Sequence, residues 1–156
     1  GVYYGAPPTG GGSWKDKILA ELPLDRSRLH FTGYLDRQEF LTVLQASTVH
    51  VYLTRPFILS WSMLEAMACG CTLVASATQP VQEVVVDGVN GLLADFFAPQ
   101  QLADKVEDAL TDASLRKTLS YRARETILER YDLRMVLPRQ LALLQQVIEA
   151  GRSVRR

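Results

Sequence analysis

The apolar run Cys-Thr-Leu-Val-Ala at residues 71–75 constrains the fold more than any other feature of the sequence. Polar and apolar residues do not alternate in it, and this pattern is typical of a strand that is covered on both faces. Strands of this kind occur in parallel sheets, because the helical crossovers that join parallel strands pack against both sides of the sheet. The run therefore predicts a parallel sheet between layers of helices.

Strand and helix patterns alternate on either side of this run. The predicted strands cover residues 29–32, 48–53, 71–75 and 92–93. The predicted helices are one capped by Ser13, those over residues 36–46, 60–68 and 81–86, and three amphipathic helices that close the chain. This order predicts an α/β fold, with a Rossmann-like parallel sheet and helices on both faces. Residues 1–151 are expected to form one domain, and residues 152–156 a frayed tail.

Composition argues against several classes of protein. Seventeen basic residues balance seventeen acidic ones in 156 residues, and this balance argues against a general nucleic-acid partner. Two cysteines cannot form a disulfide framework, which indicates a reducing, cytoplasmic environment. Cys69 and Cys71 flank one glycine, a poor spacing for two ligands of one zinc ion, and no histidine lies near them in the sequence. No metal site is expected.

Ligands of parallel α/β sheets bind at the carboxyl ends of the strands, so the loops after the strands are the candidate sites. The loop after the predicted strand 48–53, residues 54–62, is the most informative, because it ends in the predicted helix start at residues 59–62. Unpaired backbone N–H groups at such a start favour an anion. Glu65 lies one turn further on. Its spacing alone leaves two roles open, a ligand for hydroxyl groups or a residue on the solvated side of a helix.

Several of these segments together resemble one known family. They are residues 60–76 (SWSMLEAMACGCTLVAS), 82–93 (QEVVVDGVNGLL), 31–35 (FTGYL) and 46–49 (ASTV). The combination resembles the glycosyltransferases of family 4, and it covers most of residues 29–110. These enzymes are retaining, use nucleotide sugars and have the two-domain GT-B fold. The resemblance implies that this chain is the C-terminal, donor-binding half of such an enzyme.

The resemblance also implies roles for individual residues. Glu65 matches the family's ribose ligand, and Phe57 stands where the family has a glutamate that contacts the donor sugar. Ile58, Leu59 and Ser60 replace the glycine-rich turn between those two glutamates. The implied donor-binding residues are Glu65, Phe57, Ile58, Leu59, Ser60, Trp61, Ser62, Gly33 and Tyr34, the last two beside the nucleobase. Backbone N–H groups of the helix start would meet the sugar and the diphosphate. No catalytic residue is assigned.

Two parts of the family pattern have no counterpart in the sequence. An arginine and a lysine that neutralise the diphosphate would precede Gly1, and the N-terminal acceptor-binding domain is missing. The chain is therefore expected to be truncated, to self-associate through uncovered apolar surface and to transfer no sugar alone. The resemblance implies no metal or other cofactor, a nucleotide-diphosphate sugar as substrate, and a cytoplasmic location, with contact to the inner membrane surface left open through the missing domain.

Two other functions stay open at this point. Phe57 suggests a nucleotide-binding module that has lost catalysis, because an aromatic ring cannot accept hydrogen bonds from sugar hydroxyls as a glutamate does. A GT-B nucleotide-sugar epimerase would share the same donor-binding half. The favoured interpretation is the donor-binding domain of a retaining glycosyltransferase that moves a sugar to an acceptor hydroxyl.

Overall fold

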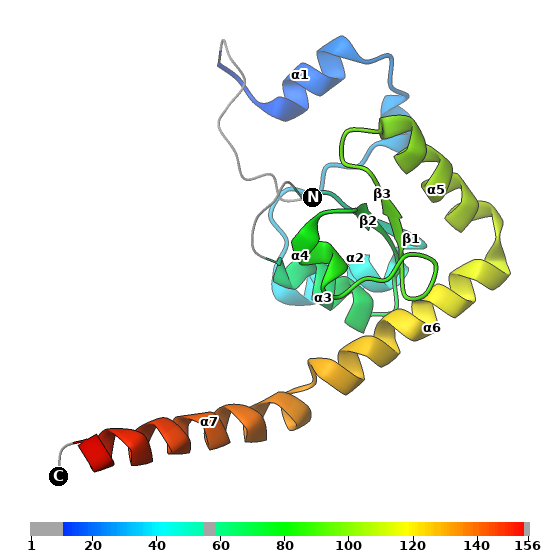
Figure 1. The fold of residues 1–156 in the computed structure, drawn as a ribbon. Helices are drawn as coiled ribbons and strands as arrows, with labels where there is room; N and C mark the ends of the chain where they lie inside the picture. Colours follow the sequence, from blue (N-terminus) through cyan, green and yellow to red (C-terminus); the bar gives the residue numbers. More distant parts are fainter. Residues whose placement is uncertain (1–10, 55–58, 155–156) are drawn as a thin grey trace. The chain divides into compact units, whose positions relative to one another are not determined.

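The computed structural model of this chain describes residues 11–54 and 59–154 (Figure 1). The chain divides into two compact units, residues 1–35 and 36–156. The second unit contains every strand of the described part of the chain and most of its helices. The sheet and the helix start that the sequence singles out both belong to this second unit.

The first unit contains the helix α1 (Trp14–Glu21) and the short 3-10 helix η1 (Arg26–Arg28). Ser13 caps α1, because its hydroxyl oxygen accepts a hydrogen bond from the Asp16 N–H at 3.1 Å. The predicted strand over residues 29–32 is wrong. Leu29 has an extended backbone (φ −111°, ψ 118°), but residues 29–32 pair with no strand in the described part of the chain. An extended segment becomes a strand only when a neighbour supplies the hydrogen bonds.

The second unit is built on a parallel sheet with the order β1-β2-β3 (Figure 1). Its strands are β1 (Val49–Tyr52), β2 (Thr72–Ser76) and β3 (Leu92–Ala94). Val74 in the central strand pairs with Val51 on one side and with Leu92 on the other. Every residue of β2 is buried, so the prediction of a strand covered on both faces is confirmed.

The helices of the second unit follow the predicted order. They are α2 (Arg37–Ala46), α3 (Trp61–Ala68), α4 (Gln79–Gln82), α5 (Pro99–Thr111), α6 (Ala113–Arg130) and α7 (Leu133–Val154). The largest difference from the predicted bounds is in α4, which spans residues 79–82 and not 81–86. Pro80 fits the first turn of a helix, whereas the β-branched Val84 and Val85 leave the helix and are buried in the core. Residues 152–154 belong to α7, where the sequence predicts a frayed tail.

The core lies on both faces of the sheet. Leu73 and Ala75 pack with residues of α3 and the end of α6, together with Val81, Val84 and Val85 around α4. Val74, whose side chain points to the opposite face, packs with Leu92 and with residues of α5 and the start of α6. The predicted arrangement of helices on both faces is therefore confirmed.

Asn90 has a structural role that its sequence context does not indicate. The sequence places it in an Asn-Gly turn, yet its side chain is only 4% exposed. Its Oδ1 atom accepts from the Val86 N–H at 2.7 Å, and its Nδ2 group donates to the Val84 carbonyl and the Thr126 hydroxyl, both at 3.0 Å. Asn90 thereby fastens the connection between α4 and β3 to the helix α6.

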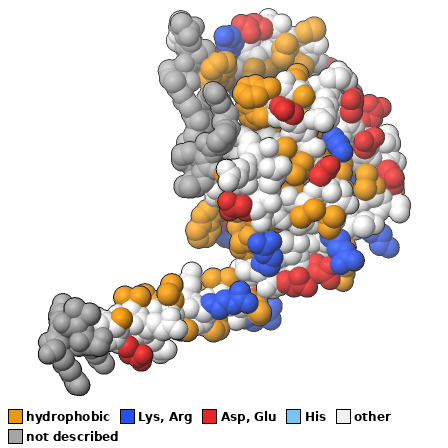
Figure 2. Space-filling model, viewed as in Figure 1, with side chains coloured by type: hydrophobic (Ala, Val, Ile, Leu, Met, Phe, Trp, Pro, Cys, Tyr) orange, Lys and Arg blue, Asp and Glu red, His pale blue; other side chains and the backbone are white. Residues whose placement is uncertain are grey.

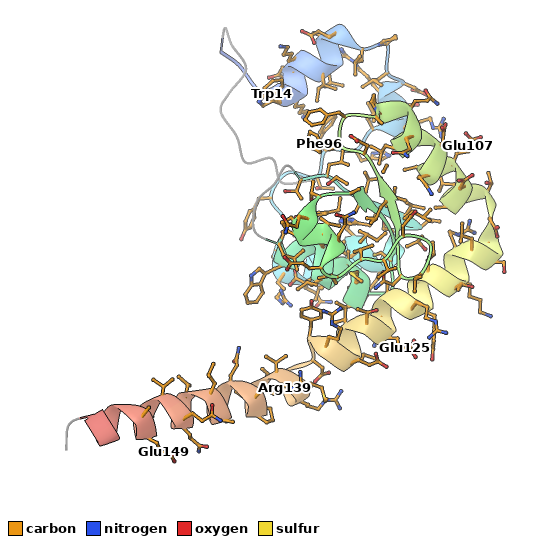
Figure 3. All side chains as sticks on the ribbon, viewed as in Figure 1. Trp14, Phe96, Glu107, Glu125, Arg139 and Glu149 are labelled. Carbon is orange, nitrogen blue, oxygen red and sulfur yellow. The ribbon has the colours of Figure 1, made fainter. Side chains whose placement is uncertain are left out.

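The helix α7 carries large apolar side chains that are exposed to solvent. Figure 2 shows hydrophobic side chains along this helix, and Figure 3 shows the charged Arg139 and Glu149 projecting from it. The exposed apolar residues include Leu133, Leu137, Leu141, Leu144 and Ile148. None of the helices in the described residues is both long and apolar enough to cross a membrane. The expected self-association of the chain stays a prediction.

Candidate binding site at the carboxyl edge of the sheet

The carboxyl ends of the three strands are tied to one another by hydrogen bonds. The Ser76 hydroxyl, at the end of β2, accepts from the Thr54 N–H and donates to the Thr54 carbonyl, each at 3.0 Å. The Ala77 N–H donates to the Ala94 carbonyl, at the end of β3, at 2.7 Å. These bonds hold the loops that follow β1 and β2 against a fixed edge, which is where ligands bind in sheets of this kind.

The helix α3 begins at this edge with a serine cap. Ser60 has an extended backbone, and its hydroxyl oxygen accepts from the Ser62 N–H at 3.3 Å and lies 2.8 Å from the Ser62 hydroxyl. The predicted helix start is therefore confirmed. Leu59 is half-buried and packs against the core cluster that contains Leu73. Its side chain anchors the cap, so only its backbone is suited to the implied contact with a ligand.

Trp61 faces away from the core. The residue is 83% exposed, so it does not fill the core. An exposed tryptophan at the first position of α3 offers a flat apolar surface beside the helix start. Phe57 and Ile58, the other implied ligands of this loop, lie outside the described residues.

Glu65 forms an ion pair with a residue of another helix. Its Oε1 atom lies 2.7 Å from Nη1 of Arg37, the first residue of α2. The Glu65 side chain is 25% exposed, and the Arg37 side chain is 73% exposed. Glu65 thus lies at the boundary of the core rather than on a freely solvated side of α3. Sequence reasoning missed Arg37 as its partner, because the two residues are 28 positions apart and no local pattern links them.

The two residues implied beside the nucleobase belong to the first unit of the chain. Gly33 has a positive φ of 67°, a conformation that glycine adopts without steric cost. The Tyr34 side chain is 96% exposed. Their implied role stays a prediction.

Cys71 is a core residue, and the half-buried Cys69 packs beside it. The Cys71 thiol donates to the Leu44 carbonyl at 2.9 Å, and burial raises the pKa of this thiol to about 11. A thiol with so high a pKa is a poor nucleophile and a poor metal ligand at neutral pH. In residues 11–54 and 59–154, no three His, Cys, Asp or Glu side chains gather to hold a metal ion.

Thr78 carries a buried hydroxyl at the same edge of the sheet. Its Oγ1 atom has no hydrogen-bond partner in the described part of the chain, and it does not cap α4. We therefore expect Thr78→Val to leave the free energy of unfolding unchanged or to raise it slightly. Thr72→Val is the matched control, because the buried Thr72 hydroxyl donates to the Arg116 carbonyl at 3.3 Å. Loss of this hydrogen bond should lower the free energy of unfolding by about 1–3 kcal/mol.

Urea denaturation of both variants measures this difference. Equal destabilisation by the two substitutions would show that the Thr78 hydroxyl has a partner in the folded chain, for example an ordered water molecule.

Comparison with known proteins decides the family. Residues 10–126 match the family described as glycosyl transferases group 1. The chain belongs to this family. Among curated members, an uncharacterized glycosyltransferase of Methanocaldococcus jannaschii is 30% identical over 105 residues, which cover 67% of this chain and 27% of that protein. The chain thus spans little more than a quarter of the length of that relative.

Solved structures of glycosyltransferases share the fold of this group 1 chain. Sucrose-phosphate synthase from Thermosynechococcus elongatus matches with a TM-score of 0.70 and 29% identity, over 80% of this chain and 31% of that one. The Anabaena protein HepE in complex with UDP matches with a TM-score of 0.65 and 25% identity, over 81% of this chain and 33% of that one. The predicted GT-B type of α/β fold is confirmed.

Proposed function

We propose that this chain is the donor-binding part of a retaining glycosyltransferase and that it holds a nucleotide-diphosphate sugar at the carboxyl edge of the sheet. The observation that carries the proposal is the placement of a capped helix start and a carboxylate, Glu65, on one helix at this edge. The solved structure of HepE with UDP supports the choice of ligand, because that protein shares the fold.

Each part of the site has a task that follows from its chemistry. The start of α3 presents backbone N–H groups and the positive end of a helix dipole, which stabilise the charge of a diphosphate. Glu65 accepts hydrogen bonds from the ribose hydroxyls, which fixes the nucleotide in one orientation. The backbone N–H groups at the start of α3 also stabilise the diphosphate as it leaves, which lowers the barrier to transfer. In a retaining reaction the acceptor hydroxyl attacks from the face from which the diphosphate departs.

Transfer itself needs an acceptor held beside the sugar, and such positioning accounts for several kcal/mol of a barrier, about 7–11 at most. We assign the acceptor site, and the basic pair that offsets the diphosphate, to regions other than this donor-binding part. The chain alone should bind the donor without transferring its sugar.

Titration calorimetry tests this function. UDP, GDP and ADP are titrated into the chain one at a time, and we expect saturable binding of at least one of them. The same nucleotide should compete with its own sugar derivative. If none of the three binds at millimolar concentration, the proposed donor site is wrong.

A module that binds nucleotide without catalysis is the second candidate, and Phe57 is the observation that favours it. With no glutamate at this position, the sugar should add little to the affinity. We expect UDP-glucose and UDP to bind within about tenfold of each other, or about 1.4 kcal/mol. If UDP-glucose binds more than about tenfold more tightly than UDP, other residues contact the sugar in place of the family's glutamate.

The variant Phe57→Glu provides the matched comparison for this prediction. Restoring the carboxylate should raise the affinity for UDP-glucose relative to UDP, because a charged acceptor then meets the sugar hydroxyls. An unchanged ratio in Phe57→Glu would remove residue 57 from sugar recognition.

A further inference from the structure

We propose that Arg37 is a positioning residue of the donor site, which holds the Glu65 carboxylate in the orientation that accepts hydrogen bonds from the ribose hydroxyls. The inference rests on the proposed function and adds to it a residue that no sequence motif identifies. Its basis is the 2.7 Å contact between Arg37 Nη1 and Glu65 Oε1, which joins α2 to α3.

The backbone of Arg37 is held in place by a double cap at the start of α2. The Asp36 side chain accepts from the Glu39 N–H at 2.8 Å, and the Glu39 side chain accepts from the Asp36 N–H at 3.0 Å. This capping box determines where α2 begins, and therefore fixes the backbone position from which the Arg37 side chain extends. The guanidinium thus reaches Glu65 from a well-defined position.

The backbone of Glu65 is also held in place, by the packing of its neighbours in α3. Its neighbours Ala66 and Met67 are fully buried, so this part of α3 cannot shift without opening the core. Only the side-chain torsions of Glu65 remain to be set, and the contact with Arg37 sets them. Formation of the ion pair between Arg37 and Glu65 therefore costs little further backbone conformational entropy.

The contact leaves half of the carboxylate available. A carboxylate has two oxygens with about four acceptor positions, and the described hydrogen bond to Glu65 involves Oε1. Oε2 is then directed by the same contact, and it can accept from the adjacent hydroxyls of a ribose.

A purely structural role would have a different consequence. An ion pair with an arginine as exposed as Arg37 contributes about 0–1 kcal/mol to stability. Its removal should therefore change the unfolding temperature little. Its effect on ligand recognition can be larger, because an unheld glutamate samples several rotamers and must be ordered when the nucleotide binds.

The experiment compares a nucleotide with an analogue that lacks one ribose hydroxyl. UDP and 2′-deoxy-UDP are titrated into the wild-type chain, Arg37→Ala and Arg37→Lys, with GDP and 2′-deoxy-GDP as a second pair. We expect the wild type to prefer the ribonucleotide by about tenfold or more, the effect of one hydrogen bond to a charged acceptor. Arg37→Ala should lose most of this preference, and Arg37→Lys should restore part of it.

Arg122→Ala is the matched control. Arg122 forms an ion pair with Glu125 at the same distance, 2.7 Å, within α6. Its removal should change neither the preference nor the unfolding temperature. A thermal melt of each variant shows that it is folded before it is titrated.

Each remaining outcome has a definite meaning. If Arg37→Ala keeps the full preference, or binds UDP more tightly than the wild type, Arg37 does not position Glu65 and the inference is wrong. If the wild type binds a nucleotide with no preference for the ribose hydroxyl, the inference is again wrong while the proposed function stands. If the wild type binds none of these four nucleotides and does not bind ADP either, the proposed function fails as well.

Discussion

Leu73→Ala is expected to lower the free energy of unfolding by about 2–5 kcal/mol, a large share of the total stability of a domain of this size. Leu73 lies in the central strand, is fully buried and packs with residues from α3, α6 and the segment around α4. Truncation leaves a cavity that these elements cannot fill, because each is held by other contacts. Urea denaturation followed by circular dichroism measures the change.

Leu110→Ala is the control for this prediction. Leu110 lies on α5 with a 51% exposed side chain, so the same chemical change removes little buried surface. We expect a change of about 1 kcal/mol or less, reduced further by the high helix propensity of alanine. Similar losses in the two variants would mean that β2 is not the centre of the core.

Glu65→Ala is expected to weaken nucleoside diphosphate binding by roughly ten- to hundredfold. Hydrogen bonds to a charged acceptor contribute about 1.5–3 kcal/mol, and alanine leaves the ribose hydroxyls without that acceptor. The effect on folding should be small, since the ion pair that is lost has an exposed arginine as its partner. Titration of UDP and GDP into both proteins measures the affinities.

Glu125→Ala serves as the matched control for that titration. Glu125 is also a glutamate within a helix, and it is paired with an exposed arginine at 2.7 Å. It lies on α6, and its loss should leave the nucleotide affinity unchanged. Equal affinities of the wild type and Glu65→Ala would remove Glu65 from the binding site.

The sequence by itself determined the elements whose signals are local. Ser13, Asp36 and Ser60 each precede a helical apolar pattern, and each of them caps a helix in the structure. The unbroken apolar run at residues 71–75 identified the central strand, because only burial on both faces removes the need for alternation. The α/β class and the candidate edge of the sheet follow from these local patterns alone.

The tertiary structure decided what depends on partners far away in the sequence. Residues 29–32 have the composition of a strand but pair with no strand among the described residues, and Asn90 has the context of a turn but is buried against Thr126. Arg37 meets Glu65 only because α2 and α3 pack together. Pairing, burial and ion-pair geometry depend on which surfaces meet in the fold. Local pattern and propensity carry no information about which surfaces pack together. The missing strand, the buried asparagine and the ion pair are therefore visible only in the tertiary structure.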